Sequence, residues 1–516
     1  MKDSKILVID LFAGPGGLGE GFSSCKTSTG ETAFQIGVSI EKDPSAHRTL
    51  TTRALFRKLA SNPEAKKDYY HYVQGKITRE QLFEKYPDEA AQALEETLEA
   101  PQTLGEDNEL IHAKIQALVE NHDGTKVVIG GPPCQAYSLA GRSRNAGNKE
   151  YKAEDDHRHF LYKEYLKVLS IAKPEVFVME NVRGILSAKV NDKLIFPDIL
   201  KDLRNPSVAT DTPDMSEYKI YSLVTSADDP AHPDYKNVSD FLIRSERYGI
   251  PQARHRVILL GVRSDIEGIP DTLQLSETDS ISVKSVIDDL PPLRSGLSKQ
   301  EDTEELWAKI VSDYIVQLKK LMDKQEQDKR DGFNALELAP KRGLPRKSSE
   351  YDNSQEMLIP EPLKSWLMDK DLQCVLNHET RGHIESDLLR YVFCAVYALL
   401  NEGTSPKSQD FPKELAPEHA NWETGAHADR FRVQSADKFA TTITSHISKD
   451  GHYFIHYDPT QCRSLTVREA ARLQTFPDNY YFEGNRTQQY VQVGNAVPPF
   501  LAKQISEVVL NLLNKK

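Results

Sequence analysis

The most informative residue of this chain is a cysteine that follows two glycines and two prolines. Cys134 ends the run 130–134, which comes directly after the apolar stretch 127–129. That stretch predicts a buried strand, and the fixed φ angles of the prolines stiffen the turn behind it. A thiol held at such a strand end could bond covalently to a substrate, because the thiolate is the nucleophilic form of cysteine. The alternative for an isolated cysteine is a buried structural role.

Two other motifs could supply acid and cation chemistry near this thiol. Glu180 ends the apolar stretch 176–179, and a buried carboxyl there could hold a proton and donate it. Arg254 and Arg256 follow Gln252 at alternate positions, so on an extended segment the three side chains would share one face. Guanidinium groups on that face could bind a phosphate, polarise a carbonyl oxygen or pair with Glu180. Each motif alone is also compatible with ordinary exposed residues.

A glycine-rich turn precedes these motifs and predicts a cofactor site. Gly14, Gly16 and Gly19 form the pattern G-x-G-x-x-G after the apolar stretch 6–9, and Glu41 follows the next apolar stretch. Such a turn brings the backbone close to a nucleotide-type ligand, and the carboxylate can bind ribose hydroxyls. The pattern by itself is compatible with NAD, FAD or S-adenosylmethionine, and a plain glycine turn is the remaining alternative.

The elements that position these motifs alternate between strands and helices. Strands are predicted at 6–9, 33–40, 127–129, 176–179 and 256–262, and a helix is predicted at 160–172. This alternation predicts an α/β fold with a parallel, doubly wound sheet. Near the C-terminus, Thr466 and Glu469 form a capping box before a helix, and an apolar stripe over 501–512 predicts the last helix.

These motifs occur in an order that resembles the DNA (cytosine-5) methyltransferase family. The resemblance runs from residue 10 to 257 and resumes from about 430 to 499. Its blocks are 10–17, 131–135, 180–182, 252–256, 463–469 and 492–498. Any one block could arise by chance, whereas the whole set in this order is specific to the family.

The resemblance implies an α/β fold with a Rossmann-like sheet of the AdoMet-dependent methyltransferase type and a separate, smaller target-recognition domain. It places the catalytic domain at 1–263, with a helical insertion at about 51–104. The target-recognition domain is expected at 264–429, and the segment 430–516 is expected to complete the catalytic domain. Within the insertion, Glu95 and Glu96 are expected to form a solvated face.

The resemblance also implies four catalytic residues: Cys134, Glu180, Arg254 and Arg256. Cys134 would attack carbon 6 of cytosine, and Glu180 would bind or protonate ring nitrogen 3. Arg256, together with Arg254, would bind the carbonyl oxygen of the base, and carbon 5 would receive the methyl group. Because a duplex hides carbon 6 in the base stack, the base must flip out. The polar segment 138–159 is expected to be a loop that closes over it.

The implied cofactor is S-adenosyl-L-methionine, and no metal site is expected. The residues expected to bind the cofactor are Phe12, Gly14, Gly16, Gly17, Glu41, Asp107, Pro132, Asn495 and Val497. Asp107 stands for the family's acidic residue near the adenine, which here follows the long insertion and so departs from the family pattern. The run 377–379 with His383 lacks the spacing of a metal site.

The prediction is therefore an enzyme that methylates carbon 5 of cytosine in a specific duplex DNA sequence. It would act through a covalent Cys134 adduct on a flipped base, in a bacterial restriction-modification or phage-defence setting. An RNA methyltransferase of the same chemistry is the alternative. A Rossmann oxidoreductase would leave Cys134, Glu180 and Arg256 without roles, and a non-catalytic DNA-binding protein would leave Cys134 and Glu180 unused.

Composition limits these hypotheses only broadly. The 516 residues include five cysteines without a Cys-x-x-Cys pair, and the N-terminus lacks the apolar stretch of a signal peptide. A reduced, cytoplasmic protein outside the membrane is therefore expected. The formal net charge of −12 argues against coating nucleic acid by bulk charge, but a local basic cleft stays compatible with it. The expected partners are duplex DNA and a cognate restriction endonuclease or other defence-system proteins.

Overall fold

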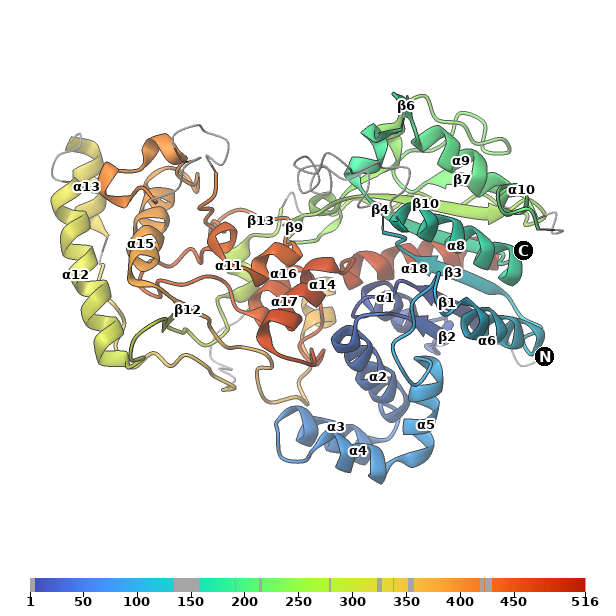
Figure 1. The fold of residues 1–516 in the computed structure, drawn as a ribbon, viewed down its shortest axis with the longest axis horizontal. Coiled ribbons are helices and arrows are strands. Elements are labelled where there is room, and N and C mark those ends of the chain that lie inside the picture. The colour runs from blue at the N-terminus through green and yellow to red at the C-terminus, as the bar shows by residue number, and fades with distance from the viewer. Residues whose placement is uncertain are drawn as a thin grey trace. The chain divides into compact units, whose positions relative to one another are not determined.

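The computed structural model describes residues 5–133, 157–190, 192–212, 216–277, 280–322, 327–336, 338–350, 357–417, 422 and 429–515. The chain divides into two compact units (Figure 1). Unit 1 consists of Met1–Tyr248, Arg254–Ser276 and Ala496–Lys516, and unit 2 consists of Gly249–Ala253 and Glu277–Asn495.

The limits of these units differ from the boundaries expected from the sequence. The segment 430–495 was expected to pack with the N-terminal domain, but its contacts place it in unit 2, and the chain returns to unit 1 only at Ala496. The physical reason is that helices α16 (Val467–Leu473) and α17 (Arg486–Asn495) pack on each other and on α11 (Val283–Ile287) and the turn Ser445–Ser448 of the same unit. The order of motifs along a chain does not reveal which body buries them.

A seven-stranded sheet forms the centre of unit 1. The strands of its main path, in spatial order, are β2 (Phe34–Ile40), β1 (Ile6–Leu11), β3 (Lys126–Gly130), β4 (Val176–Val182), β10 (His255–Arg263) and β7 (Tyr218–Ser222). The seventh strand, β8 (Leu242–Arg244), pairs with β10. The first four strands are parallel to one another, which confirms the α/β class.

The expectation of a wholly parallel sheet is wrong at β10. This strand runs antiparallel to β4, β7 and β8. It follows β8 after a short segment with no crossover helix, and only antiparallel strands can be joined so directly. An apolar run in the sequence indicates a buried strand but carries no information about its direction.

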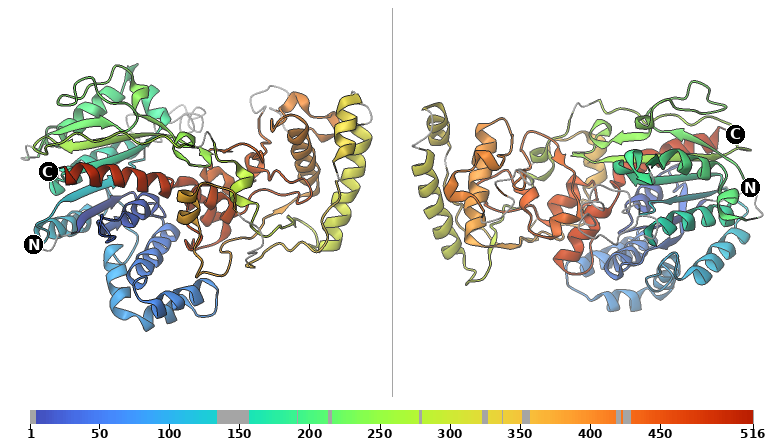
Figure 2. Two further views of the ribbon diagram at one scale, coloured as in Figure 1. Left: turned by 180° about the vertical axis from the view of Figure 1, so that it is seen from behind. Right: turned by 45° about the horizontal axis from the view of Figure 1, so that its top comes forward.

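Helices cover both faces of this sheet (Figures 1 and 2). Ile9 and Leu11 of β1 belong to a core cluster with residues of α6 (Asn108–Glu120), α8 (His157–Ala172) and α9 (Phe196–Arg204). Asp10 points to the other face, where its carboxylate approaches Gly19 of α1 (Gly17–Ser24). Helix α18 (Pro499–Asn514) packs along α1, and its apolar stripe is buried as the sequence predicts. Short elements complete the unit: α10 (Pro206–Thr210), β5 (Lys189–Val190) and β6 (Lys193–Leu194).

The insertion between β2 and β3 is helical, as predicted. It contains α2 (Pro44–Leu59), α3 (Pro63–Val73), α4 (Arg79–Lys85) and α5 (Pro87–Glu96). Glu95 is exposed and pairs with Lys114, but the expectation of a solvated face is wrong for Glu96. Glu96 is buried and binds Arg57 and Lys58 of α2, and Arg53 of the same helix binds the buried Glu20 of α1. A buried charge needs such partners, which the local sequence does not identify.

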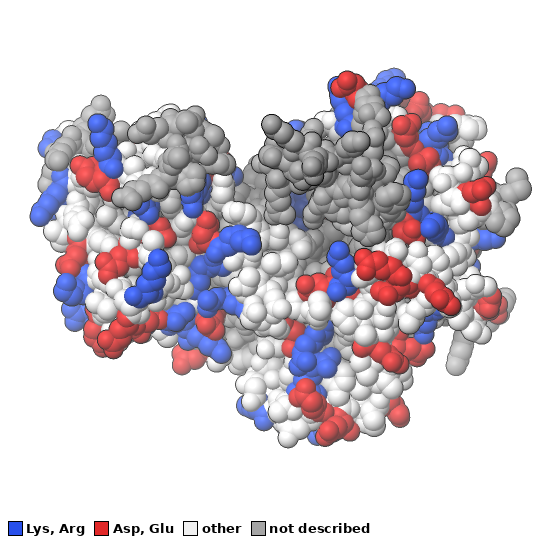
Figure 3. All heavy atoms as spheres, in the orientation of Figure 1, with Lys and Arg blue, Asp and Glu red and all other residues white. Residues whose placement is uncertain are grey.

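Unit 2 combines two helical groups with short strand pairs. Its apolar core lies among α12 (Glu304–Met322), α13 (Gln327–Ala335) and α15 (Glu385–Leu400), with Trp307 fully buried. Helix α14 (Glu361–Leu367) and the pairs β9 (Gln252–Ala253) with β13 (Ala440–Thr441) and β11 (Gly296–Leu297) with β12 (Gly382–His383) complete it. Charged side chains of both signs appear on the face drawn in Figure 3. Among the described helices, none is both long enough and apolar enough to cross a membrane.

The tight packing of α1 on α18 gives a stability prediction for Gly21. A Cβ at this position would lie 2.5 Å from the backbone carbon of Ala502 and the backbone nitrogen of Lys503. In a free helix, alanine would stabilise by about 1 kcal/mol relative to glycine, but overpacking costs about 1–3 kcal/mol. We expect Gly21→Ala to lower the thermal unfolding midpoint.

The matched control is Gly332→Ala in α13, where the added Cβ would meet only the mobile end of the Leu400 side chain. This variant should be neutral or stabilising. Equal gains in the melting temperature of both variants would contradict the packing of α1 on α18 described above.

Candidate active site

The loop after β1 has the backbone conformation that a tight glycine turn requires. Gly14 and Gly16 have φ angles of 57° and 96°, a region that favours glycine, and Phe12 adopts φ 55° while packing against the core. A Cβ at Gly14 would meet no atom within 4 Å, so the space above the loop is open. Gly17, by contrast, lies so close to the carbonyl oxygen of Val497 that a side chain would not fit. The loop is therefore closed toward Val497 and open above Gly14.

Glu41 is tied to this loop at the end of β2. Its carboxylate accepts hydrogen bonds from the backbone N–H groups of Gly14 (2.8 Å) and Asp43 (2.7 Å). Burial raises the pKa of Glu41, and the two N–H donors oppose that shift. Each carboxylate oxygen keeps further acceptor capacity, so Glu41 can also bind hydroxyl groups of a ligand.

Asp10 is a buried carboxyl group directly under the same loop. It is 1% exposed, and neither of its carboxylate oxygens has a hydrogen-bond partner among the described residues. Burial raises the pKa of Asp10 to about 8, although Arg57 acts in the opposite direction. The open loop and Glu41 fit a ligand that carries hydroxyl groups.

The two glycines at the end of β3 are required by close approach of neighbouring strands. A Cβ at Gly130 would lie 2.5 Å from the carbonyl oxygen of Leu11, its register partner on β1. A Cβ at Gly131 would lie 2.7 Å from Oε2 of Glu180. The segment that leads to residue 134 therefore passes directly over the Glu180 carboxylate.

The structure brings Glu180 and Arg256 together. Arg256 Nε lies 2.6 Å from Glu180 Oε1, and both side chains are mostly buried, at 13% and 14% exposed. The antiparallel register of β10 on β4 places them at this distance, because Val182 pairs with Arg256 and Glu180 pairs with Ile258. This ion pair leaves Oε2 of Glu180 directed at Gly131.

Asn181 connects β4 to the segment before Cys134. Its amide nitrogen donates a hydrogen bond of 3.1 Å to the carbonyl oxygen of Pro132, and Asn181 is buried. Sequence reasoning did not place Asn181 among the site residues, although its position beside Glu180 was the available signal. Cys134 itself and residues 138–156 of the expected loop lie outside the described part of the chain.

The other predicted residues of the arginine motif, Gln252 and Arg254, belong to different units. Arg254 is fully buried in unit 1, where Ser245 donates a hydrogen bond to its carbonyl oxygen, and burial lowers the pKa of its guanidinium. Gln252 belongs to unit 2, where its side chain binds the Ile443 N–H and the Leu473 carbonyl. The strand is interrupted between them, so the alternation expected from the sequence does not hold for Gln252.

Two predicted cofactor residues, Asp107 and Asn495, form no hydrogen bond or ion pair with the glycine loop among the described residues. Asp107 is exposed, and its carboxylate accepts a hydrogen bond from the Thr103 N–H. Gln102, which sequence reasoning missed, donates its backbone N–H to the Glu41 carbonyl at 3.0 Å, so the chain before Asp107 runs beside Glu41. Asn495 is exposed at the end of α17 and belongs to unit 2.

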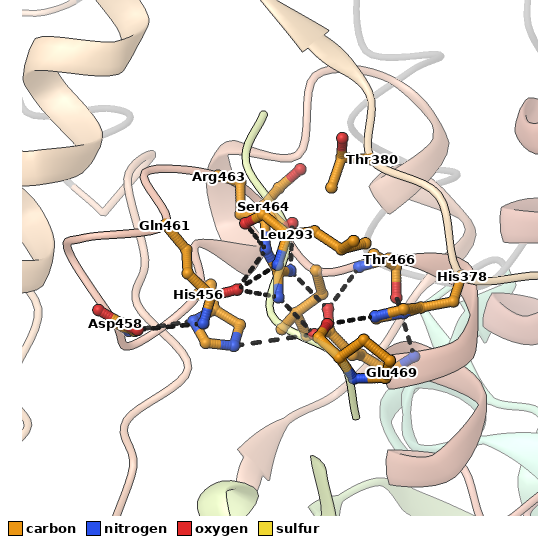
Figure 4. Close-up of polar contacts among 12 residues, drawn as sticks. Leu293, His378, Thr380, His456, Asp458, Gln461, Arg463, Ser464, Thr466 and Glu469 are labelled. Carbon is orange, nitrogen blue, oxygen red and sulfur yellow. Dashed lines mark hydrogen bonds and ion pairs between the residues drawn. The ribbon is translucent and has the colours of Figure 1, made fainter. Parts of the chain in front are cut away.

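The block 463–469 forms a buried polar cluster in unit 2 (Figure 4). Arg463 makes two hydrogen bonds to Glu469 and also binds the Leu293 carbonyl at 3.1 Å. Glu469 accepts the Thr466 N–H, which completes the predicted capping box. His378 is part of the same cluster and binds Thr466 and the Pro291 carbonyl. Burial lowers the pKa of His378 to about 4, so its imidazole is neutral and serves as a structural link at neutral pH.

This geometry agrees with a comparison of the chain with known protein families. A family model described as C-5 cytosine-specific DNA methylase matches residues 79–207 and 234–511. The chain belongs to this family. It is thus a DNA cytosine-5 methyltransferase, and the matched residues include Glu180, Arg254 and Arg256.

Individual relatives of this methyltransferase agree with the family model. The chain is 33% identical to the type II methyltransferase M.Bpa9945I of Bacillus paralicheniformis, with 99% of both chains covered. It is 27% identical to the type II methyltransferase M.DdeI of Desulfomicrobium norvegicum, over 75% of this chain and 74% of the relative. Its fold is similar to a solved prophage-encoded E. coli protein described as a DNA modification methyltransferase (TM-score 0.54, 19% identity, 99% and 100% coverage).

The buried carboxyl of Asp10 gives a prediction of pH dependence. Between about pH 4 and pH 8 the unfolded chain loses the Asp10 proton while the folded chain retains it. The contribution of Asp10 to stability therefore falls as pH rises through this window, by at most about 1.4 kcal/mol per pH unit. We expect Asp10→Asn to gain stability relative to the wild type as pH rises from about 5 to about 7.5.

Thermal unfolding midpoints measured across this range would check the prediction. The control is Asp123→Asn, which changes an exposed aspartate ahead of β3 and should follow the wild-type curve at a constant offset. A constant offset for Asp10→Asn as well would show that Asp10 titrates normally.

Proposed function

We propose that this methyltransferase transfers the methyl group of S-adenosyl-L-methionine to carbon 5 of cytosine in a specific duplex DNA sequence. The single observation that carries the proposal is the Glu180–Arg256 pair directed at Gly131, three residues before Cys134. An acid, a fixed cation and a nucleophile at one strand edge are the groups that this chemistry needs. Membership of the family favours DNA over RNA as the substrate.

The loop after β1 is proposed to hold S-adenosyl-L-methionine. Gly14, Gly16 and Gly17 would bring the backbone close to the ligand, and Glu41 would bind the ribose hydroxyls. The unpartnered Asp10 carboxyl, which burial keeps protonated at neutral pH, would be able to donate a hydrogen bond below this loop. Phe12, Pro132 and Val497 would contribute to the walls, and the roles of Asp107 and Asn495 stay predictions. When bound, this cofactor supplies an electrophilic methyl group.

The chain's own residues would activate the cytosine. The Cys134 thiolate would form a bond from its sulfur to carbon 6. The electron pair of the 5,6 double bond would move into the bond between carbons 4 and 5, and that of the 3,4 double bond to nitrogen 3, so that carbon 5 becomes nucleophilic. Glu180 would donate a proton or a hydrogen bond to nitrogen 3, which accepts this density. Arg256, with Arg254 behind it, would orient Glu180 and bind the carbonyl oxygen of the base. After methylation, loss of the carbon 5 proton to a base would expel the thiolate and restore the ring.

Asn181 has a positioning role in this proposal. Its hydrogen bond to the Pro132 carbonyl would fix the direction in which the chain leaves β3 toward Cys134. The flipped base costs a few kcal/mol of lost stacking, which contacts from the segment 138–159 would offset. Unit 2 would supply target recognition, and relatives named type II methyltransferases favour a restriction-modification setting with a cognate endonuclease.

Cys134 gives the direct test of the covalent mechanism. Duplex DNA that carries 5-fluorocytosine cannot lose its carbon 5 substituent as a proton, so a reacted enzyme should stay attached through residue 134. We expect mass spectrometry to find the adduct at Cys134 and Cys134→Ser to form none while still binding the cofactor. Labelled cofactor offered with duplex DNA or RNA should label the DNA.

Methyl transfer at a substantial rate by Cys134→Ser would contradict the assignment of the nucleophile. Labelling of RNA in place of DNA would contradict the proposed substrate class. A second cysteine substitution, Cys394→Ser in the core of unit 2, is the control, and it should keep its activity if the protein folds.

The Glu180–Arg256 pair gives a second prediction. Glu180→Gln keeps the shape of the side chain but removes the acid, and we expect the rate of methyl transfer to fall by about 10²–10⁴-fold. Cofactor binding should be unchanged, because Glu180 lies on β4 and Glu41 follows β2. Single-turnover rates and cofactor binding curves would measure the two effects separately.

Arg256→Lys is the companion variant, since it keeps the charge but loses the planar guanidinium. It should retain more activity than Arg256→Ala. Equal activity of all three variants and the wild type would show that the pair has only a structural role.

A further inference from the structure

Unit 2 contains a group of arginines that the proposed chemistry does not use. Four arginines, Arg294, Arg346, Arg381 and Arg486, lie around Thr380. The guanidinium groups of Arg346 and Arg486 bind the Thr380 carbonyl, the backbone carbonyl of Arg294 accepts a hydrogen bond from the Thr380 hydroxyl, and Arg381 follows Thr380 in the chain. We call these four residues, with their carboxylate partners Asp302 and Glu379, the Thr380 cluster. All of them belong to unit 2.

The contacts of this cluster are well defined. The Thr380 carbonyl accepts hydrogen bonds from Arg346 (3.0 Å) and Arg486 (2.8 Å). Asp302 lies between Arg294 (2.6 Å) and Arg346 (2.7 Å). The Thr380 carbonyl is thus shared by the guanidinium groups of Arg346 and Arg486. The Asp302 carboxylate is likewise shared, by Arg294 and Arg346.

The shared partners leave a surplus of positive charge. Glu379 binds Arg486 at 3.0 Å, and Arg381 is held by the Lys449 carbonyl and by the ring of Tyr490 at 4.9 Å, neither of which carries a negative charge. Three nitrogens of the cluster, Nε of Arg294, Arg346 and Arg381, are buried without a hydrogen-bond partner among the described residues.

The neighbouring segment 341–347 adds to this surplus. It contains four cations and no carboxylate, and its end is joined to the cluster because Lys347 pairs with Glu379 by backbone bridging. Lys341 pairs with Asp458, and the Gly343 N–H binds Glu304, whereas Arg342 and Lys347 are exposed and form no ion pair within the described part of the chain.

Counted together, seven cations stand against four carboxylates in this region: Arg294, Lys341, Arg342, Arg346, Lys347, Arg381 and Arg486 against Asp302, Glu304, Glu379 and Asp458. The local balance is therefore +3 in a chain whose formal net charge is −12. Basic side chains gather near the position of β12 on the face in Figure 3. An anionic partner would relieve this concentration of charge.

The geometry favours phosphate as that anion. The side chains of Arg346 and Arg486 are each about one third exposed, and the Thr380 carbonyl orients both of their guanidinium groups. A planar guanidinium that is already oriented loses little entropy when it donates to phosphate oxygens. Exposed Arg342 and Lys347 extend the same surface without being needed for the fold.

We propose that the Thr380 cluster, with Arg342 and Lys347, binds the phosphate backbone of the duplex DNA that this enzyme methylates. The inference rests on the proposed function and adds to it the surface of unit 2 that holds the duplex. Such contacts fix the register of the protein on DNA but do not read its sequence. They should therefore contribute equally to target and non-target DNA.

The test uses the full chain and a fluorescent mixed-sequence duplex of about 30 base pairs, titrated by anisotropy between about 50 and 200 mM salt. The variant carries Arg342→Ala and Lys347→Ala, two exposed changes that spare the cluster's internal hydrogen bonds. Loss of two phosphate contacts should make the slope of log K against log salt shallower by about 2 and weaken binding about tenfold near 150 mM salt. Arg486→Ala, which also removes a bond to Thr380, should weaken binding further if it folds.

The matched control carries Lys319→Ala and Lys320→Ala, which remove two exposed charges at the C-terminal end of α12. Its slope and affinity should equal those of the wild type. An unchanged slope for Arg342→Ala with Lys347→Ala, or an equal change in the control, would overturn the proposal. A larger loss on an RNA duplex than on DNA would overturn the choice of DNA.

Methyl transfer to DNA by the wild type is measured in parallel, so the two proposals can fail separately. If the wild type methylates DNA but the salt slopes do not differ, only the phosphate surface is wrong. If the slopes differ as expected but no methyl group is transferred to DNA, the surface stands and the proposed function fails.

Discussion

The candidate site depends on one ion pair between two antiparallel strands. Glu180 and Arg256 face each other only because β10 runs against β4 in a fixed register, and their 2.6 Å contact keeps both side chains in place at the carboxyl end of the sheet. Breaking a pair of this kind by removing one partner costs about 3–5 kcal/mol when it is fully buried, and less with the partial exposure seen here. The close passage of Gly131 then follows from the space that the Glu180 carboxylate takes up.

A second set of buried charges connects the glycine loop to the helical insertion. Helix α1 follows the loop directly and carries Glu20, which is held by Arg53 of α2. Arg57 and Lys58 of the same helix hold Glu96 at the end of α5. The insertion thus does more than cover the surface, because it supplies the countercharges that allow an acidic residue to be buried behind the loop. Asp10 is the buried acid in this region that is left without a hydrogen-bond partner among the described residues.

Unit 2 also contains a buried ion pair, and there the pair connects separate segments of the chain. The Arg463–Glu469 pair is nearly inaccessible to solvent, and its hydrogen bonds tie the segments around residues 293 and 466 to one helix. A unit with short strands and long connections needs such ties, since its backbone makes few ladder hydrogen bonds. The Thr380 cluster differs because its charges are not balanced and two of its arginines reach the surface.

The sequence by itself determined the class of fold, the main strands, the last helix, the capping box at Thr466 and the family of the enzyme. These features depend on local periodicity, on glycines and prolines at fixed positions and on the order of short motifs, all of which are visible along the chain. Only the tertiary structure decided the antiparallel direction of β10, the burial of Glu96 and the separation of Gln252 from Arg256. It also decided that 430–495 packs in unit 2 and that Arg346 and Arg486, which are far apart in the sequence, share the Thr380 carbonyl. Each of these depends on which segments come together in space, and neither hydropathy nor spacing encodes such long-range pairing.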